Sequence, residues 1–199
     1  LVDENNSRRD QLREREEENP IMALDGIRTL TSSVTGTIGL SGAEIVAILP
    51  SQSRAFVTSG DGLLLVDFSD PANPSLIRTI DPSANSASSE TGITSVAVNA
   101  AGLVAVAYAG DDEQANGEIQ FYDAEGVFQG AVTVGPLPDS VAFNDAGTHV
   151  IVANEGESAG DENEPDATPN PNGSVSIIAV NAADPAMSVV NTFDFTDAS

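Results

Sequence analysis

The chain has 199 residues, of which 31 are Asp or Glu and only seven are basic, all of them Arg, so its formal net charge is -24. This charge excludes nucleic-acid and anionic-membrane binding, because phosphate contacts need clustered Lys and Arg. The absence of Cys excludes disulfides and thiolate metal sites, and a single histidine, His149, argues against zinc. No run of about 18 apolar residues could span a bilayer as a helix.

The charge is unevenly distributed. Five of the seven Arg fall in the first 30 residues, whereas residues 31–199 carry 23 acids against only Arg54 and Arg78. Such a surface stays hydrated in salty or calcium-rich water, which favours a marine or halophilic extracellular protein. An acidic cytosolic protein is the alternative.

Residues 1–25 differ from the rest of the chain. They are rich in charge, lack an apolar stripe and begin with Leu1 rather than Met, so we expect an N-terminal arm or linker from which something upstream was removed. A helix that docks on a partner is the alternative for this arm.

Residues 26–199 alternate short apolar runs with turns rich in Gly, Asn, Asp and Pro, a pattern typical of strands. A repeat appears when the runs are aligned on Val46, Val96 and Val141. Each repeat holds four expected strands, at 43–49, 54–59, 62–69 and 75–80, then 93–99, 103–109, 117–123 and 128–134, then 139–145, 149–155, 173–180 and 188–195.

A four-stranded unit that recurs every 40 to 50 residues is typical of a β-propeller blade. We therefore predict an all-β fold with three blades, at about 43–82, 93–135 and 138–196. A β-sandwich is the alternative, although it has no reason to repeat the strand order three times.

Three blades do not close a ring, because propellers use about four to eight. We expect the remaining blades to come from a longer parent or from another chain, so that this chain is the N-terminal part of a larger propeller. The segment GIRTLTSSV at 26–34 is a candidate outer strand for the last blade of that ring.

The run GPLPDSVAFNDAGTHVIVANEGE at 135–157, followed by NGSVSII at 172–178, resembles the choice-of-anchor I family. SGAEIVAI at 41–48 and GLLLVDFSDPANPSLIRTID at 62–81 resemble that family's first blade, so the likeness covers about residues 24–199. The resemblance implies a secreted bacterial propeller of the seven-bladed type, often attached to surface anchors. Members of the family carry labels such as alkaline phosphatase and mesenchyme-specific cell-surface glycoprotein.

The sequence places acids on one expected face of the propeller, where the innermost strands start and the second and third strands of each blade connect. The innermost strands start near Glu44, Thr94 and Asp139, and the connection of the third blade begins with Glu155 and Glu157. Calcium accepts six to eight oxygen ligands and suits irregular acidic loops. We predict Ca²⁺ bound by Glu44, Asp139, Glu155 and Glu157; the alternative is that these acids only solvate the surface.

The residues leave open whether the protein is an enzyme. No nucleophile elbow or phosphate loop is present, Arg54 and Arg78 lie in strand patterns that suggest structural use, and His149 opens a strand at the far end from Glu155. Asn154 either orients a ligand or the backbone of the loop, or acts only as a turn former. We therefore predict an extracellular calcium-binding propeller, for which the resemblance implies a metal-dependent phosphatase or phosphodiesterase acting on a phosphate ester. The alternative is a non-catalytic adhesion or scaffold module that binds a surface protein.

Overall fold

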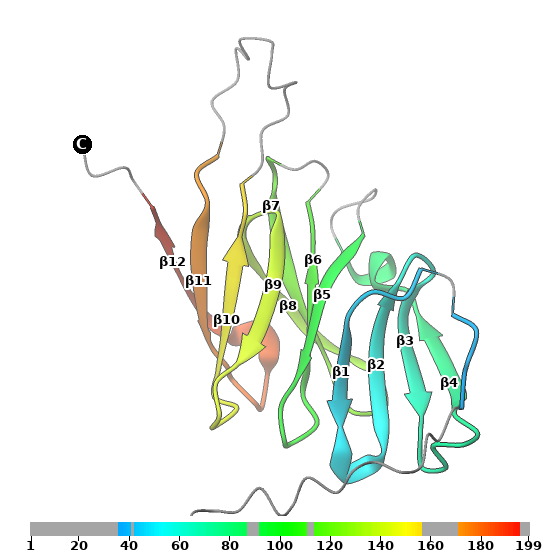
Figure 1. The fold of residues 1–199 in the computed structure, drawn as a ribbon. Helices are drawn as coiled ribbons and strands as arrows, with labels where there is room; N and C mark the ends of the chain where they lie inside the picture. Colours follow the sequence, from blue (N-terminus) through cyan, green and yellow to red (C-terminus); the bar gives the residue numbers. More distant parts are fainter. Residues whose placement is uncertain (1–35, 41, 87–91, 111–113, 157–170, 196–199) are drawn as a thin grey trace, which may run out of the picture. The chain divides into compact units, whose positions relative to one another are not determined.

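The computed structural model describes residues 36–40, 42–86, 92–110, 114–156 and 171–195. These residues form three four-stranded antiparallel sheets, each built from strands that are consecutive in the chain (Figure 1). The first sheet contains β1 (Val46–Leu49), β2 (Arg54–Ser59), β3 (Gly62–Asp67) and β4 (Ser75–Ile80). The second contains β5 (Ile93–Val98), β6 (Val104–Tyr108), β7 (Asn116–Tyr122) and β8 (Phe128–Pro136). The third contains β9 (Pro138–Phe143), β10 (His149–Asn154), β11 (Ser174–Ala179) and β12 (Val189–Asp194).

The three sheets confirm the predicted blades, because each runs in the strand order that the repeat requires. The aligned valines are also equivalent in register. Val46 pairs with Val57, Val96 with Val106 and Val141 with Val152, each on the second strand of its own sheet. A sandwich would not produce three sheets with one register.

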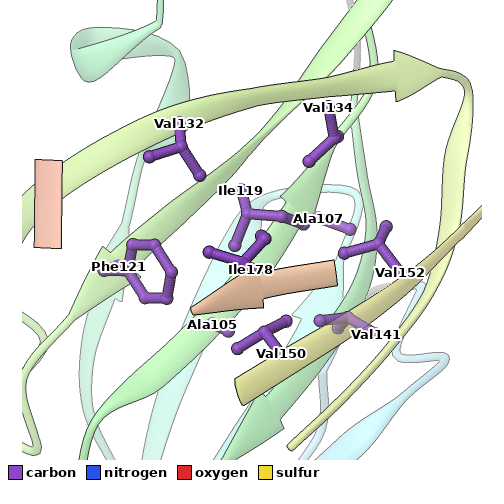
Figure 2. Packing of buried hydrophobic residues seen from close by; sticks show 10 residues of the cluster. All are labelled: Ala105, Ala107, Ile119, Phe121, Val132, Val134, Val141, Val150, Val152 and Ile178. Carbon is purple, nitrogen blue, oxygen red and sulfur yellow. The ribbon is translucent and has the colours of Figure 1, made fainter. Parts of the chain in front are cut away.

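Two hydrophobic cores lie between neighbouring sheets. The first core joins the first and second sheets and contains Phe56, Leu63, Leu65, Ile80, Val96, Val104, Val106 and Tyr122. The second joins the second and third sheets and contains Ala105, Ala107, Ile119, Phe121, Val132, Val134, Val141, Val150, Val152 and Ile178 (Figure 2). Burying one Val, Leu, Ile or Phe side chain contributes about 1.5–3 kcal/mol, so these contacts hold the sheets together.

β6 shows why the middle sheet is apolar on both faces. Successive side chains of a strand point to opposite faces, so Val104 and Val106 enter the first core while Ala105 and Ala107 enter the second. All four are fully buried. A sheet packed between two others thus needs continuous apolar strands rather than an alternating pattern.

The two ends of the sheets differ in the connections that they carry. At one end, which we call the turn end, the same tight turn recurs at 99–102, 123–126 and 144–147, each closed by a glycine with positive φ. The amide of Gly102 donates to the carbonyl of Asn99 at 3.0 Å, and the other two turns repeat this bond. The opposite end, which we call the loop end, carries the starts of β1, β5 and β9 and the connections β2–β3, β6–β7 and β10–β11.

Two predictions concern residues outside the described part of the chain. They are the N-terminal arm at 1–25 and the outer-strand candidate at 26–34. The boundary between arm and propeller therefore stays a prediction.

Candidate functional site

The loop end holds three of the four predicted calcium ligands. Glu44 directly precedes β1, Asp139 lies in β9, Glu155 follows β10, and all three side chains are exposed. Thr94, the equivalent residue of the second sheet, is half-buried and donates a hydrogen bond from Oγ1 to the carbonyl oxygen of Pro138. The starts of the innermost strands therefore lie at one end, and the binding of Ca²⁺ there stays a prediction.

Asp139 and Glu155 belong to one tightly built corner of the third sheet. Pro138 pairs with Asn154 across β9 and β10, and a register shift falls between Ala153 and Asn154. The amide of Glu155 donates to the carbonyl of Leu137 at 2.9 Å. The start of the β10–β11 connection is thus hydrogen-bonded to the residue two positions before Asp139.

Leu137 allows this corner to form. Its φ of 47° lies in the left-handed region that residues other than glycine seldom adopt. The amide of Gly156, itself at φ 64°, donates to the carbonyl of Pro136 at 3.3 Å. Two hydrogen bonds therefore tie the β8–β9 connection to the start of the β10–β11 connection.

Asn154 is buried beneath this corner, with 3% of its surface exposed. Its Nδ2 donates to the hydroxyls of Ser174 and Ser176, each at 3.0 Å, while its Oδ1 is buried with no hydrogen-bond partner in the structure. Gly135 leaves room for the amide, because a Cβ there would lie 2.7 Å from Nδ2. Asn154 therefore holds β10 to β11 rather than forming a turn.

Ser174 and Ser176 are buried structural partners of Asn154 that the sequence did not predict. A signal existed, because small polar residues at period two stand on the face of β11 that also carries the buried Ile178. Polar residues at core positions require partners, and Asn154 supplies them.

The described residues do not bring the acids into one cluster. Glu44 belongs to the first sheet, and Asp139 and Glu155 belong to the third. Within the described ranges, no three side chains of Asp, Glu, His or Cys are grouped as metal ligands. Glu157, the fourth predicted ligand, lies outside those ranges.

The cationic residues of the body lie away from the loop end. Arg54 donates to Glu125 Oε1 at 2.8 Å and Arg78 to the carbonyl of Glu125 at 3.3 Å, so both hold the β7–β8 turn, as their strand positions suggested. His149 is exposed at the turn end, with Nδ1 3.0 Å from Thr148 Oγ1. None of these three side chains faces the acids of the loop end.

A hollow of about 410 Å³ opens at the turn end, and sequence reasoning did not anticipate it. Its walls include Leu103, Val180 and Pro185, with Asp123 and Gln129 at the polar side. The side-chain Nε2 of Gln129 donates to Asp123 Oδ2 at 3.1 Å, and Asp123 Oδ1 accepts the backbone amides of Glu125 and Val127. These polar groups are thus engaged in holding the β7–β8 turn.

The three sheets, packed face to face through two shared cores, define a β-propeller, and one solved propeller has the same fold. The chain is similar to the β-propeller domain of Cps50 (Swd1) from Myceliophteria thermophila, with a TM-score of 0.54 and 11% identity over 79% of this chain and 46% of that one. Weaker likenesses are to Kuenenia stuttgartiensis hydrazine synthase and to a nidogen/laminin complex, with TM-scores of 0.44 and 0.45 and identities of 14% and 12%. They cover 78% and 76% of this chain, and 55% and 48% of those chains.

At these identities the likeness shows the fold alone. The family is shown by sequence: the model of the choice-of-anchor I domain matches residues 44–199, and the chain belongs to this family. Family membership points to a cell-surface or extracellular protein.

No protein of curated function matches the chain. The chain spans about half the length of the solved structures that it resembles. Among the described residues, no helix is long and apolar enough to cross a membrane.

Proposed function

We propose that this chain is part of an extracellular β-propeller that binds Ca²⁺ at its loop end and acts as a non-catalytic binding or scaffold module. The observation that carries the proposal is the corner of the third sheet. There, Asp139 and Glu155 are both exposed, and they directly follow the two members of the cross-strand pair Pro138 and Asn154. Carboxylates carried by two adjacent strands add negative potential at this corner, which attracts a cation.

The oxygen atoms available at this corner are of the type that binds calcium. Carboxylate and carbonyl oxygens are the hard ligands that Ca²⁺ takes, in irregular geometry and with bound water. Glu157 follows two residues after Glu155 and would add a third carboxylate. Glu44 stays a predicted ligand at the same end of the first sheet.

When bound, the ion would offset the repulsion between the acids and stiffen the β10–β11 connection. The chain's own residues supply the framework. The hydrogen bond from the Glu155 amide to the Leu137 carbonyl holds the end of β10 against the β8–β9 connection. The side chain of Asn154 holds β10 to β11 through Ser174. A stiffened acidic face is suited to holding a basic or neutral partner.

Phosphoesterase activity is the second candidate and rests on the family resemblance. A phosphate ester needs cationic groups to stabilise its transition state. Arg54 and Arg78 are engaged with Glu125 at the turn end, so bound metal would have to supply that charge. We therefore favour the binding module over the enzyme.

The test is direct measurement of calcium binding by titration calorimetry after chelation. Glu155→Gln/Glu157→Gln removes two charges at the proposed site, and Asp145→Asn/Asp184→Asn removes two at the turn end as a matched control. The proposal expects the first pair to weaken binding by at least roughly tenfold, about 1.4 kcal/mol, and the control pair to leave it nearly unchanged. An equal loss of calcium affinity in the two double variants would contradict the proposal, because calcium binding would then depend only on the net charge of the protein.

Hydrolysis of an aryl phosphate, measured on the same chelated and calcium-restored protein, separates the two candidate functions. Binding without turnover supports the module. Turnover that returns with calcium and is lost in Glu155→Gln/Glu157→Gln would replace it with the enzyme.

A further inference from the structure

The chain holds two Asn-Gly pairs, Asn116-Gly117 and Asn172-Gly173, and the fold places them in different surroundings. An asparagine followed by glycine is the pair most prone to spontaneous deamidation, because glycine has no Cβ to shield its backbone nitrogen. The reaction begins when this nitrogen approaches the side-chain Cγ of the asparagine. Whether a folded protein permits the reaction therefore depends on how firmly the two residues are held.

The pair Asn116-Gly117 is held inside the second sheet. Asn116 begins β7 and pairs with Pro136 of β8. Gly117 is buried, and a Cβ on it would lie 2.4 Å from the ring Cδ of Pro138 and 2.7 Å from the carbonyl oxygen of Tyr108. The backbone has little room to turn here, so ring closure at Asn116 first requires β7 to open locally.

The pair Asn172-Gly173 lies outside the strands. Both residues precede β11, which begins at Ser174; Asn172 is exposed and Gly173 is half-buried. The Gly173 carbonyl accepts the amide of Phe195 at 3.3 Å, but the Gly173 amide donates no hydrogen bond to any of the described residues. The nearest atom that a Cβ on Gly173 would meet is the carbonyl oxygen of Glu155, at 3.2 Å. The nitrogen that must attack is thus not restrained by a hydrogen bond within this part of the chain.

We infer that Asn172 is a site of spontaneous deamidation in the folded protein, whereas Asn116 is protected by its strand. The Gly173 nitrogen, once it has lost its proton, forms a bond to Cγ of Asn172. The bond from Cγ to Nδ2 breaks, and ammonia leaves a cyclic succinimide behind. Water then opens the ring at one of its two carbonyls, which gives aspartate or isoaspartate and adds one negative charge.

The new carboxylate arises at the loop end, near the corner that carries Glu155. Gly156 follows Glu155, and a Cβ on Gly156 would lie 2.8 Å from the carbonyl oxygen of Asn172. The added charge makes the potential at this corner more negative. If the corner binds calcium, the charge of that site changes as the protein ages. This consequence rests on the proposed function, whereas the deamidation itself does not.

The test compares the two pairs within one protein. The folded chain and the chain unfolded in guanidinium chloride are incubated with a chelator in mildly alkaline buffer, and samples are cleaved after glutamate. Glu113 and Glu118 flank Asn116, and Asn172 lies in the peptide that follows Glu164, so the two sites fall in separate peptides. Tandem mass spectrometry locates each deamidated residue, because an NH₂ group is replaced by a heavier OH group. Asn172→Gln and Asn116→Gln are the matched variants.

In the folded chain, Asn172 should deamidate at least roughly tenfold faster than Asn116, because the reaction at Asn116 requires β7 to open. Asn172→Gln should abolish the fast reaction, because glutamine closes the corresponding ring far more slowly, and Asn116→Gln should leave it unchanged. In guanidinium chloride the two rates should become similar.

Equal rates at Asn172 and Asn116 in the folded chain would overturn the inference. An Asn116 that stays equally slow in the unfolded chain would also overturn it, because the neighbouring residues and not the fold would then set the rate. The chelator keeps calcium out of both measurements. A failure of the protein to bind calcium would therefore refute the proposed function and leave these rates unchanged.

Discussion

Arg54, at the start of β2, binds Glu125 of the second sheet, with 2.8 Å between the guanidinium nitrogen and the carboxylate oxygen. The same nitrogen donates to the carbonyl of Ala124 at 2.6 Å. The two hydrogen bonds tie the first sheet to the β7–β8 turn. One of the two basic residues in the acidic body is thus used to join blades.

The carbonyl contact should matter more than the ion pair. Glu125 is 61% exposed in its side chain, and exposed ion pairs contribute about 0–1 kcal/mol. A hydrogen bond from a charged donor to a sheltered carbonyl is worth about 1.5–3 kcal/mol, so we expect Arg54→Gln to cost about 2 kcal/mol in the free energy of unfolding. Glu125→Gln should cost less than about 1 kcal/mol. Urea denaturation measures both, and equal costs would contradict this division.

Truncating a side chain of the second core should lower the free energy of unfolding far more than truncating an exposed apolar side chain of the third sheet. Ile178 is fully buried, and Ile178→Ala is expected to cost about 2–5 kcal/mol through lost transfer energy and a residual cavity. Ile151 of β10 has the same chemistry but is 44% exposed, so Ile151→Ala should cost less than about 1 kcal/mol. If urea denaturation gives the two variants comparable losses in the free energy of unfolding, the side chain of Ile151 is buried in solution, which would contradict this prediction.

Tyr122 should make the fold sensitive to alkali. Burial raises the pKa of Tyr122 to about 12, with a further contribution from the charges of Glu118 and Asp81. The folded state favours the neutral phenol, so this stability is complete below pH 10 and is lost as the pH rises from 10 to 12. A difference of about two pKa units between the unfolded and the folded state corresponds to a loss of up to about 3 kcal/mol in the free energy of unfolding.

Tyr122→Phe tests this dependence. The hydroxyl of Tyr122 donates to Gln120 Oε1, so the variant should lose about 1–2 kcal/mol near neutral pH because a buried acceptor is left unpaired. Between pH 10 and 12, however, the free energy of unfolding should fall less steeply than in the parent. Tyr108 is present in both proteins, so identical alkaline slopes would rule out Tyr122 as the cause.

The strands could be predicted from the sequence, because apolar runs bounded by Gly, Asn, Asp and Pro mark their ends. The aligned valines also revealed equivalent positions, and Val46, Val96 and Val141 have the same register in the structure. Local composition was sufficient here, because each sheet is built from strands adjacent in the chain.

The site could be predicted only in outline. Placing acids at one end follows from strand direction, but the corner depends on the positive φ of Leu137 and on a register shift beside Asn154, which no residue pattern marks. The hydrogen bond from the Val141 amide to Ser95 Oγ joins residues 46 positions apart, and that from Asn154 to Ser174 joins residues 20 positions apart. Such contacts emerge only when the sheets are packed together.

The most direct test of the proposed calcium site is the melting temperature of the chelated protein as Ca²⁺ is added. At about 100 times the dissociation constant, bound calcium stabilises the folded state by about 2.7 kcal/mol, which should raise the melting temperature by roughly 5–10 °C. The account predicts that Glu155→Gln/Glu157→Gln abolishes this rise and that Asp145→Asn/Asp184→Asn retains it. No rise in the parent protein, or the same rise in both double variants, would contradict a calcium site at this corner.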